Sequence, residues 1–148
     1  MSQEDLFSLP INPKIEPEYI DGKIIPFLNK HKHLIYDLYF TTRMPPFMQD
    51  AMGDVFRGTS DAQAAVKNAF YIRDKTGLPL SATFNNIWVK PDQKNLEEFI
   101  TNFKFLYDNG VRIATIPHTS WIMTGQIQKE YPEPVSYTHL TLPTTSKV

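Results

Sequence analysis

Polar side chains follow three short apolar segments of the chain, in positions where they could bind or activate a substrate. The first segment is followed by Thr41, Thr42 and Arg43, the second by Asn85 and Asn86, and the third by His118, Thr119 and Ser120. If the three segments are neighbouring parallel strands, their carboxyl ends meet at one edge of the sheet, where the active sites of such sheets lie. We therefore expect these side chains to converge on a single rim.

His118 and Arg43 are the candidate catalytic residues. A histidine directly after a strand can act as an acid, a base or a metal ligand; the alternative is that it caps the next helix or bonds a loop carbonyl. The planar guanidinium of Arg43 could clamp a carboxylate or a phosphate. The alternative for Arg43 is an ion pair with Asp50 or Asp54, which are four residues apart and would share one face of a helix.

Further residues near these two could bind the substrate. Asparagine amides donate and accept hydrogen bonds, although asparagine is also common in simple turns. The carboxylate of Asp50 could bind a cation or act as a base; the alternative is that it lies on a solvated helix face. The indole of Trp121 could stack on a ligand; the alternative is that it packs in the core. The candidate substrate-binding residues are Asn85, Asn86, Thr42, Thr119, Asp50 and Trp121.

The chain contains no cysteine, which excludes disulfides, thiolate metal sites, a cysteine nucleophile and a cysteine-held iron–sulfur cluster within it. The glycine-rich phosphate loops, the zinc-protease helix motif and the serine-hydrolase elbow are also absent. His31 and His33 form an H-x-H beside lysines at a helix end, where histidine is favoured by the helix dipole. We predict no metal site, and the sequence identifies no cofactor.

The charge balance is nearly even, with 15 Lys and Arg against 16 Asp and Glu and a net charge of -1. This leaves no broad basic field to bind nucleic acid or an anionic membrane. No run of about 18 apolar residues could span a bilayer. The N-terminus, MSQEDLFSLP, lacks the basic and apolar regions of a signal peptide. We expect a cytoplasmic protein whose partner is a small-molecule substrate.

Residues 135–148 have the appearance of a non-native tail. VSYTHLTLPT, at 135–144, resembles the conceptual translation of a transposon-type sequencing adapter, and a natural polar tail is the alternative. Remnants of this kind are excluded from fold reasoning. We therefore expect the chain to be a fragment cut near Pro134. Without Lys147 the charges become 14 and 16, a net of -2.

Short strands and amphipathic helices alternate along the rest of the chain. Strands are predicted at 34–40, 80–84 and 112–116, which are apolar and rich in β-branched or aromatic residues. Helices are predicted at 19–32, with an interruption at Pro26; from a capping box of Ser60 and Gln63 to Gly77; between Asp92 and Gly110; and from about Thr119 to Tyr131.

This alternation favours parallel strands with right-handed crossovers. An open doubly wound sheet and a (β/α) barrel both fit, and a complete barrel needs eight units and about 250 residues. We predict an α/β fold, a truncated (β/α)8 TIM-type barrel of about three β/α units. Its expected divisions are an extended arm at 1–18, a partial barrel at 19–134 and the non-native tail at 135–148.

Four segments between Ile35 and Glu133 carry a resemblance to a known family. They are IYDLYFTTRMPPFMQDAMGD, LPLSATFNN, FKFLYDNGVRIATIPHT and WIMTGQIQKEYPE. This part of the chain resembles the opening half of a barrel of the collagenase-like peptidase family. In that family the cysteines that hold an iron–sulfur cluster come later in the chain, and none is present here. The resemblance therefore implies the barrel but neither the cluster nor the activity.

The function expected is that of an N-terminal fragment of a TIM-barrel enzyme, which binds a small polar or anionic substrate at the carboxyl ends of its strands. The alternative is a non-catalytic α/β binding or scaffold domain. Because an incomplete barrel exposes an unpaired strand edge, the fragment is also expected to self-associate through that edge.

Overall fold

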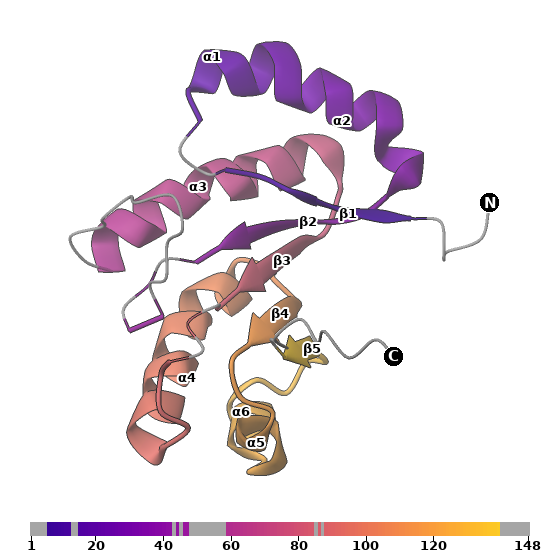
Figure 1. Ribbon diagram of the computed structural model, residues 1–148. Helices are drawn as coiled ribbons and strands as arrows, with labels where there is room; N and C mark the ends of the chain where they lie inside the picture. Colours follow the sequence, from indigo (N-terminus) through magenta and orange to yellow (C-terminus); the bar gives the residue numbers. More distant parts are fainter. Residues whose placement is uncertain are drawn as a thin grey trace, which may run out of the picture.

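Five parallel strands form a single sheet in the computed structural model, which describes residues 6–12, 15–42, 44, 46–47, 59–84, 86 and 88–139. Each strand pairs in parallel with the next along the chain (Figure 1). Doubly wound sheets reverse their strand order, whereas barrels keep the sequential order seen here. This confirms the predicted α/β fold of a truncated barrel. The strands are β1 (Phe7–Pro10), β2 (Ile35–Thr41), β3 (Leu80–Thr83), β4 (Ile113–Ile116) and β5 (Ser136–His139).

The connecting segments are helical, and because right-handed crossovers between sequential parallel strands all turn with the same hand, the helices lie against one face of the sheet. The first crossover contains a π-helical turn at Ile20–Ile24 and a 3₁₀ turn at Lys32–Leu34. The α-helices are α1 (Pro17–Tyr19), α2 (Ile25–His31), α3 (Thr59–Thr76), α4 (Gln93–Asp108), α5 (Ser120–Met123) and α6 (Gln126–Glu130).

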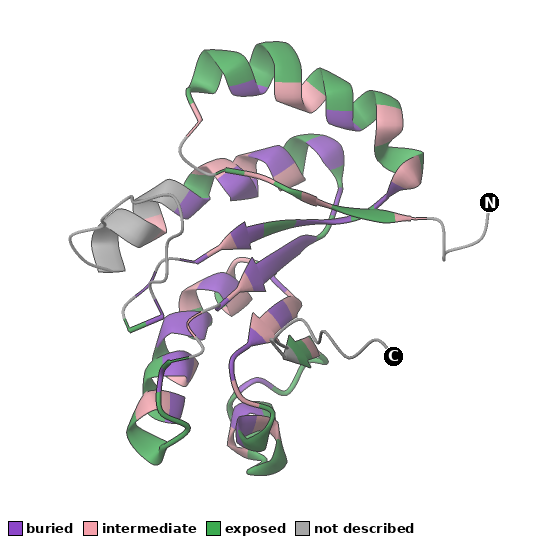
Figure 2. Ribbon diagram, viewed as in Figure 1, coloured by how far each residue is buried: buried purple, intermediate pink, exposed green. Residues whose placement is uncertain are grey.

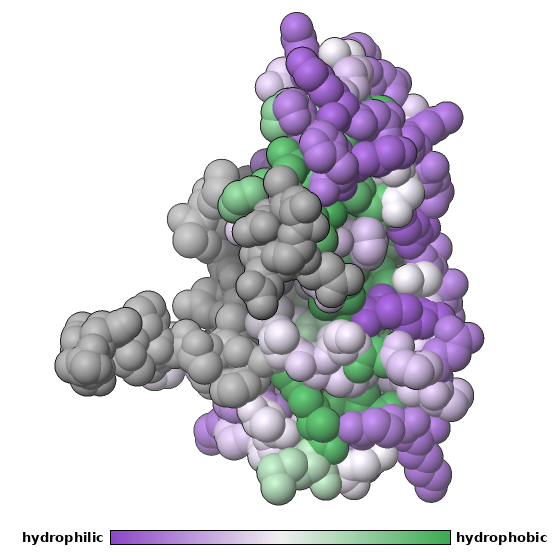
Figure 3. Space-filling model, turned by 90° about the vertical axis from the view of Figure 1, so that its right-hand side faces the viewer, coloured by the Kyte–Doolittle hydropathy of each residue, from purple (hydrophilic) through white to green (hydrophobic). Residues whose placement is uncertain are grey.

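The apolar core lies between the helices and the sheet. In Figure 2 the buried residues of β2 and β3 and the sheet-facing sides of the helices form this layer. Figure 3 shows hydrophobic residues in a band beside a hydrophilic outer surface. The predicted stripe of α4 supplies Leu96, Phe99, Phe103 and Leu106, all fully buried. The strands contribute Leu38, Phe40, Leu80, Ala82, Ala114 and Ile116.

The opposite side of the sheet, which we call the inner face, carries the alternate strand residues. The residues of β2, β3 and β4 on it include Asp37, Tyr39, Ser81, Thr83 and Thr115, which line one cavity. In a complete barrel this face would be the interior. In the described part of the chain no helix is both long and apolar enough to cross a membrane.

The prediction of one continuous helix at 119–131 was wrong. Gly125 has a φ of 76°, a left-handed conformation that ends α5 and separates it from α6. The hydroxyl of Thr124 accepts a hydrogen bond from the backbone N–H of Gln126 at 3.2 Å, so the second helix begins anew. A glycine with a flanking threonine is a helix boundary in its own right.

The other predicted helices exist with adjusted ends. Pro26 lies in the first turn of α2, and the chain before it widens into the π-helical turn because proline has no N–H to donate. Helix α3 begins at Thr59, one residue before the predicted cap, and is followed by Gly77 with a φ of 76°. The short helix expected near Met48 lies outside the described residues.

Two strands were not predicted. Strand β1 lies within the expected N-terminal arm, where an extended segment pairs with β2. Strand β5 lies within the expected tail, and the N–H of Ser136 donates to the carbonyl of Arg112 at 2.8 Å. An unpaired parallel edge accepts any extended segment rich in threonine and tyrosine, so this pairing is expected of native and non-native residues alike.

Candidate functional site

Asn86 joins the loops that follow β2 and β3. Its side-chain Nδ2 donates to the carbonyl of Pro46 at 3.0 Å, and its Oδ1 accepts from the backbone N–H of Trp88 at 3.0 Å. The first bond reaches across 40 residues of sequence, from the loop after β3 to the loop after β2. The two loops therefore lie side by side at the carboxyl edge of the sheet, as the sequence predicts.

His118 joins the next pair of loops. Its Nε2 bonds the backbone carbonyl of Val89, which belongs to the loop between β3 and α4. Because a carbonyl oxygen only accepts, Nε2 carries a proton, and in the neutral ring Nδ1 is left as the acceptor. The half-buried ring also packs edge-on against Trp121, with 5.1 Å between centroids.

Thr42 continues β2, and Thr119 lies in the turn between β4 and α5 at the same edge. The backbone N–H of Thr42 donates to the carbonyl of Thr83 at 3.0 Å, which extends the β2–β3 pairing by one residue. Its side chain is buried, and its hydroxyl has no partner among the described residues. Thr119 is exposed and precedes α5, where its carbonyl accepts from the N–H of Ile122 at 3.0 Å. We call Thr42, Asn86, His118 and Thr119 the rim.

An aromatic cluster beneath the rim holds these loops in place. Trp121 is 2% exposed and lies with Phe47, Phe84 and Phe99, which contact one another at centroid distances between 4.8 and 6.2 Å. Phe47 and Phe84 follow β2 and β3, so each strand delivers an anchor beside its polar residues. Trp121 thus packs in the core, and its indole N–H has no partner among the described residues.

Three of the predicted site residues, Arg43, Asn85 and Asp50, lie outside the described residues. The ion pair considered for Arg43 with Asp50 or Asp54 lies outside them as well. The structure thus places four of the predicted polar residues in the segments that follow the carboxyl ends of β2, β3 and β4.

The inner face carries a cavity of about 370 Å³ that the sequence analysis did not anticipate. Asp37 and Ser81 are its buried polar residues; each is 5% exposed, and the Oδ1 of Asp37 has no partner among the described residues. A signal was present in the sequence, because an aspartate interrupts the apolar run LIYDLYF. The lining includes Ser8, Asp37, Tyr39, Ser81, Thr83 and Thr115.

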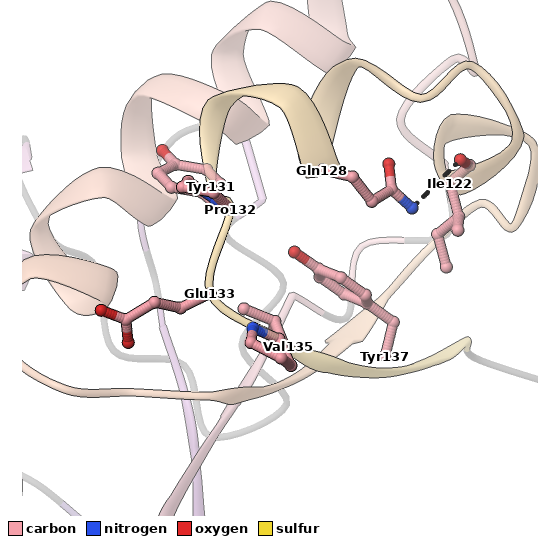
Figure 4. Close-up of a pocket in the computed structure, with 8 residues that line it drawn as sticks. Ile122, Gln128, Tyr131, Pro132, Glu133, Val135 and Tyr137 are labelled. Carbon is pink, nitrogen blue, oxygen red and sulfur yellow. Dashed lines mark hydrogen bonds between the residues drawn. The ribbon is translucent and has the colours of Figure 1, made fainter.

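A second cavity, also of about 370 Å³, lies between α5, α6 and β5 (Figure 4). Gln128 spans one side of it and donates from Nε2 to the carbonyl of Ile122 at 3.3 Å. Burial raises the pKa of Tyr137 to about 12, with a smaller contribution from Tyr107. Burial also raises the pKa of Tyr131, whose hydroxyl donates to the carbonyl of Ile100. These tyrosines are packing groups in their protonated form.

No three histidine or carboxylate side chains gather at metal-binding distance anywhere in the described ranges. The H-x-H lies at the end of α2 and in the 3₁₀ turn after it, far along the chain from the rim residues.

No protein-family model and no curated protein matches this chain. A solved structure does: a protein assigned as a phosphonomutase from Burkholderia cenocepacia J2315, with a TM-score of 0.58 and 13% sequence identity. The match covers 95% of this chain and 55% of that one, so the chain spans about half the length of its structural neighbour. The neighbour is a TIM-barrel enzyme, and the chain has the fold of part of such a barrel.

Proposed function

We propose that the chain is the N-terminal part of a TIM-barrel enzyme that binds a small polar or anionic substrate at the rim. The observation that carries the proposal is the pair of side-chain bonds, from Asn86 to Pro46 and from His118 to Val89, that bring the loops after β2, β3 and β4 to one edge. Barrel enzymes assemble their active sites from such loops. The proposal includes a relationship to the collagenase-like peptidase family and a cytoplasmic location, both on the sequence grounds given above.

The proposed chemistry divides between binding and proton transfer. Arg43 follows Thr42 at the end of β2, and we assign it to the negative charge of the substrate. His118 is held by its Nε2 bond to Val89, which leaves Nδ1 as the nitrogen that could take or give a proton. Asn85, Asn86, Thr119 and Asp50 would supply further polar contacts. The described rim hydroxyl of Thr42, which is buried and lacks a partner, supports a ligand at this edge.

A phosphonate is one anion of the proposed class, and the name of the structural neighbour makes it the first choice. We assign Trp121 to positioning His118. The two rings pack edge-on with 5.1 Å between their centroids, so the indole would hold the histidine in place.

The binding half of the proposal is tested by titrating the chain with inorganic phosphate and methylphosphonate and following its amide resonances by NMR. We expect saturable shifts at Thr42, Asn86 and Thr119, and a loss of binding of about ten-fold or more in Arg43→Ala, because a charge-assisted bond is removed. Lys104→Ala, which removes a positive charge from the exposed side of α4, is the matched control and should bind normally.

Two results would contradict the proposal. One is a folded chain whose rim resonances do not respond to either anion, which would favour a non-catalytic scaffold domain. The other is a response that survives Arg43→Ala. His118→Gln, which keeps a donor for the carbonyl of Val89, should leave anion binding intact in this chain and abolish turnover in a longer, active protein.

A further inference from the structure

The inner face is polar from its lower end to the rim. Strand register arranges its side chains in three levels, because residues paired across parallel strands lie at the same height. The interiors of TIM barrels are usually filled with layers of branched aliphatic side chains. Here hydroxyl and carboxylate groups predominate: Ser8 beside Asp37 at the lowest level, Tyr39, Ser81 and Ile113 above them, and Thr41, Thr83 and Thr115 at the top.

Asp37 is the charged group of this face. It is only 5% exposed, and its Oδ1 has no hydrogen-bond partner within the described part of the chain. It lies about 13 Å below the upper level, because Asp37 and Thr41 are four residues apart along β2. The described residues that line the cavity include no lysine, arginine or histidine. A carboxylate buried in this way costs free energy unless a positive or donating group reaches it.

We propose that the inner face is a binding site for a small hydroxylated amine, with the ammonium group bound by Asp37. The hydroxyls of Ser81 and Thr83 then contact the polar body of the ligand on the way to the rim, whereas the hydroxyl of Thr115 already bonds that of Thr138 at 2.9 Å. The inference goes beyond the proposed function, since it assigns a separate site for a positively charged ligand below the rim. The ligand contacts that we assign come from β2 and β3, although Ser136 and Thr138 of β5 also line the cavity.

The chemistry of the cavity favours an ammonium over the other candidates. An anion would meet an uncompensated carboxylate, which repels it. A divalent metal needs several oxygen ligands with more than one charge, and Asp37 is the single carboxylate that lines the cavity within the described ranges. An ammonium supplies three donors and one positive charge, which match one carboxylate with neighbouring hydroxyls. A cavity of about 370 Å³ is of the size that holds a small ligand.

The test uses three small hydroxylated probes of similar size that differ in charge: ethanolammonium, ethylene glycol and glycolate. Each is titrated into the isotopically labelled chain, and the amide resonances of Asp37, Ser81 and Thr115 are followed. We expect saturable shifts with ethanolammonium, weaker binding of ethylene glycol and none of glycolate at these residues. In Asp37→Asn the affinity for ethanolammonium should fall about ten-fold or more, because an ion-paired hydrogen bond is lost.

Two further variants keep the result interpretable. Asp74→Asn removes an exposed carboxylate from α3 and should bind ethanolammonium like the unmodified chain. Ser81→Ala keeps Asp37 but removes a hydroxyl from the cavity, and its affinity should fall only several-fold. If a folded chain shows no saturable shift with ethanolammonium, or if Asp37→Asn binds it equally well, the proposal is overturned.

This experiment separates the inference from the proposed function. If the rim does not bind anions, the resonances of Thr42 and Asn86 stay unchanged when phosphate is added, while the response to ethanolammonium remains. Failure of the inner-face site leaves the phosphate response intact and removes the response at Asp37.

Discussion

At the scale of single residues, three buried polar atoms stand out because they have no hydrogen-bond partner among the described residues: Asp37 Oδ1, Thr42 Oγ1 and Trp121 Nε1. Native proteins pair nearly all such atoms, so unpaired ones need an explanation. Asp37 lies on the inner face, Thr42 at the rim and Trp121 directly beneath His118. Of the three, Asp37 lines the cavity of the inner face, where a ligand could satisfy its free oxygen.

The first residue-scale prediction concerns stability. Asp37→Asn should raise the free energy of unfolding by about 1 kcal/mol, because a buried carboxyl group whose Oδ1 has no partner among the described residues is replaced by a neutral isostere. Urea denaturation at neutral pH measures this, with Asp74→Asn as the exposed control. A loss of stability in Asp37→Asn would mean that the carboxylate accepts a stabilising bond within the folded chain.

The second residue-scale prediction concerns alkaline pH. Burial raises the pKa values of Tyr131 and Tyr137 above the ordinary value of 10.0, that of Tyr137 to about 12. The folded chain therefore holds these protons more tightly than the unfolded chain, and the stability that they contribute is present below pH 10 and falls between pH 10 and 12.

Tyr131→Phe separates the two contributions of this side chain. At pH 8 it should cost about 1 kcal/mol, because the bond to the carbonyl of Ile100 is lost. Above pH 10 the stability of the variant should fall less steeply than that of the unmodified chain. Urea midpoints measured across this range check both points, and parallel profiles for the two chains would contradict the assignment.

At the scale of secondary-structure elements, helix α4 shows why part of the fold can be predicted from the sequence. The spacing of its apolar residues at 96–107 predicts an amphipathic helix. The residues buried as predicted are Leu96, Phe99, Phe103 and Leu106. The helix begins at Asp92, whose carboxylate accepts from the N–H of Asn95 at 2.9 Å. Local patterning of this kind is set by residues close together in the chain.

That cap supports an element-scale prediction. Asp92→Ala should lower the free energy of unfolding by about 1 kcal/mol, since the first turn of α4 loses its side-chain acceptor. Glu98→Ala, at an exposed position of the same helix, is the control and should change stability little. Thermal unfolding followed by circular dichroism measures both variants. Equal effects of the two would show that the cap contributes nothing specific.

Other elements could not be read from the sequence because non-local interactions decide them. Strand β1 is a four-residue segment that ends in a proline, and it becomes a strand by pairing with β2. The break at Gly125 depends on a backbone conformation that a lone glycine does not require. Asp37 was missed because its exclusion from the core depends on which face of β2 the helices cover. The rim residues were predictable, since they follow strand ends.

At the scale of the whole molecule, the sheet has two open edges and an inner face that no described helix covers. Parallel sheets are normally covered on both faces. Strand β1 pairs only with β2, and Phe7, at its start, is 60% exposed. This arrangement fits a partial barrel in a chain that spans 55% of the length of its structural neighbour.

The open edges lead to a prediction about association. The chain should self-associate through them, so that its sedimentation coefficient rises with concentration. Sedimentation velocity over a range of concentrations tests this. A chain that stays monomeric and unfolds in a single sharp calorimetric transition would count against an incomplete barrel.

The central claim, that these residues are the opening part of a barrel enzyme, is tested most directly by sequencing the source DNA past the codon for Pro134. The account predicts an open frame that departs from VSYTHLTLPT and encodes further alternating strands and helices, enough to close the sheet on β1. A stop codon shortly after Pro134 would contradict it and leave a small open-sheet domain.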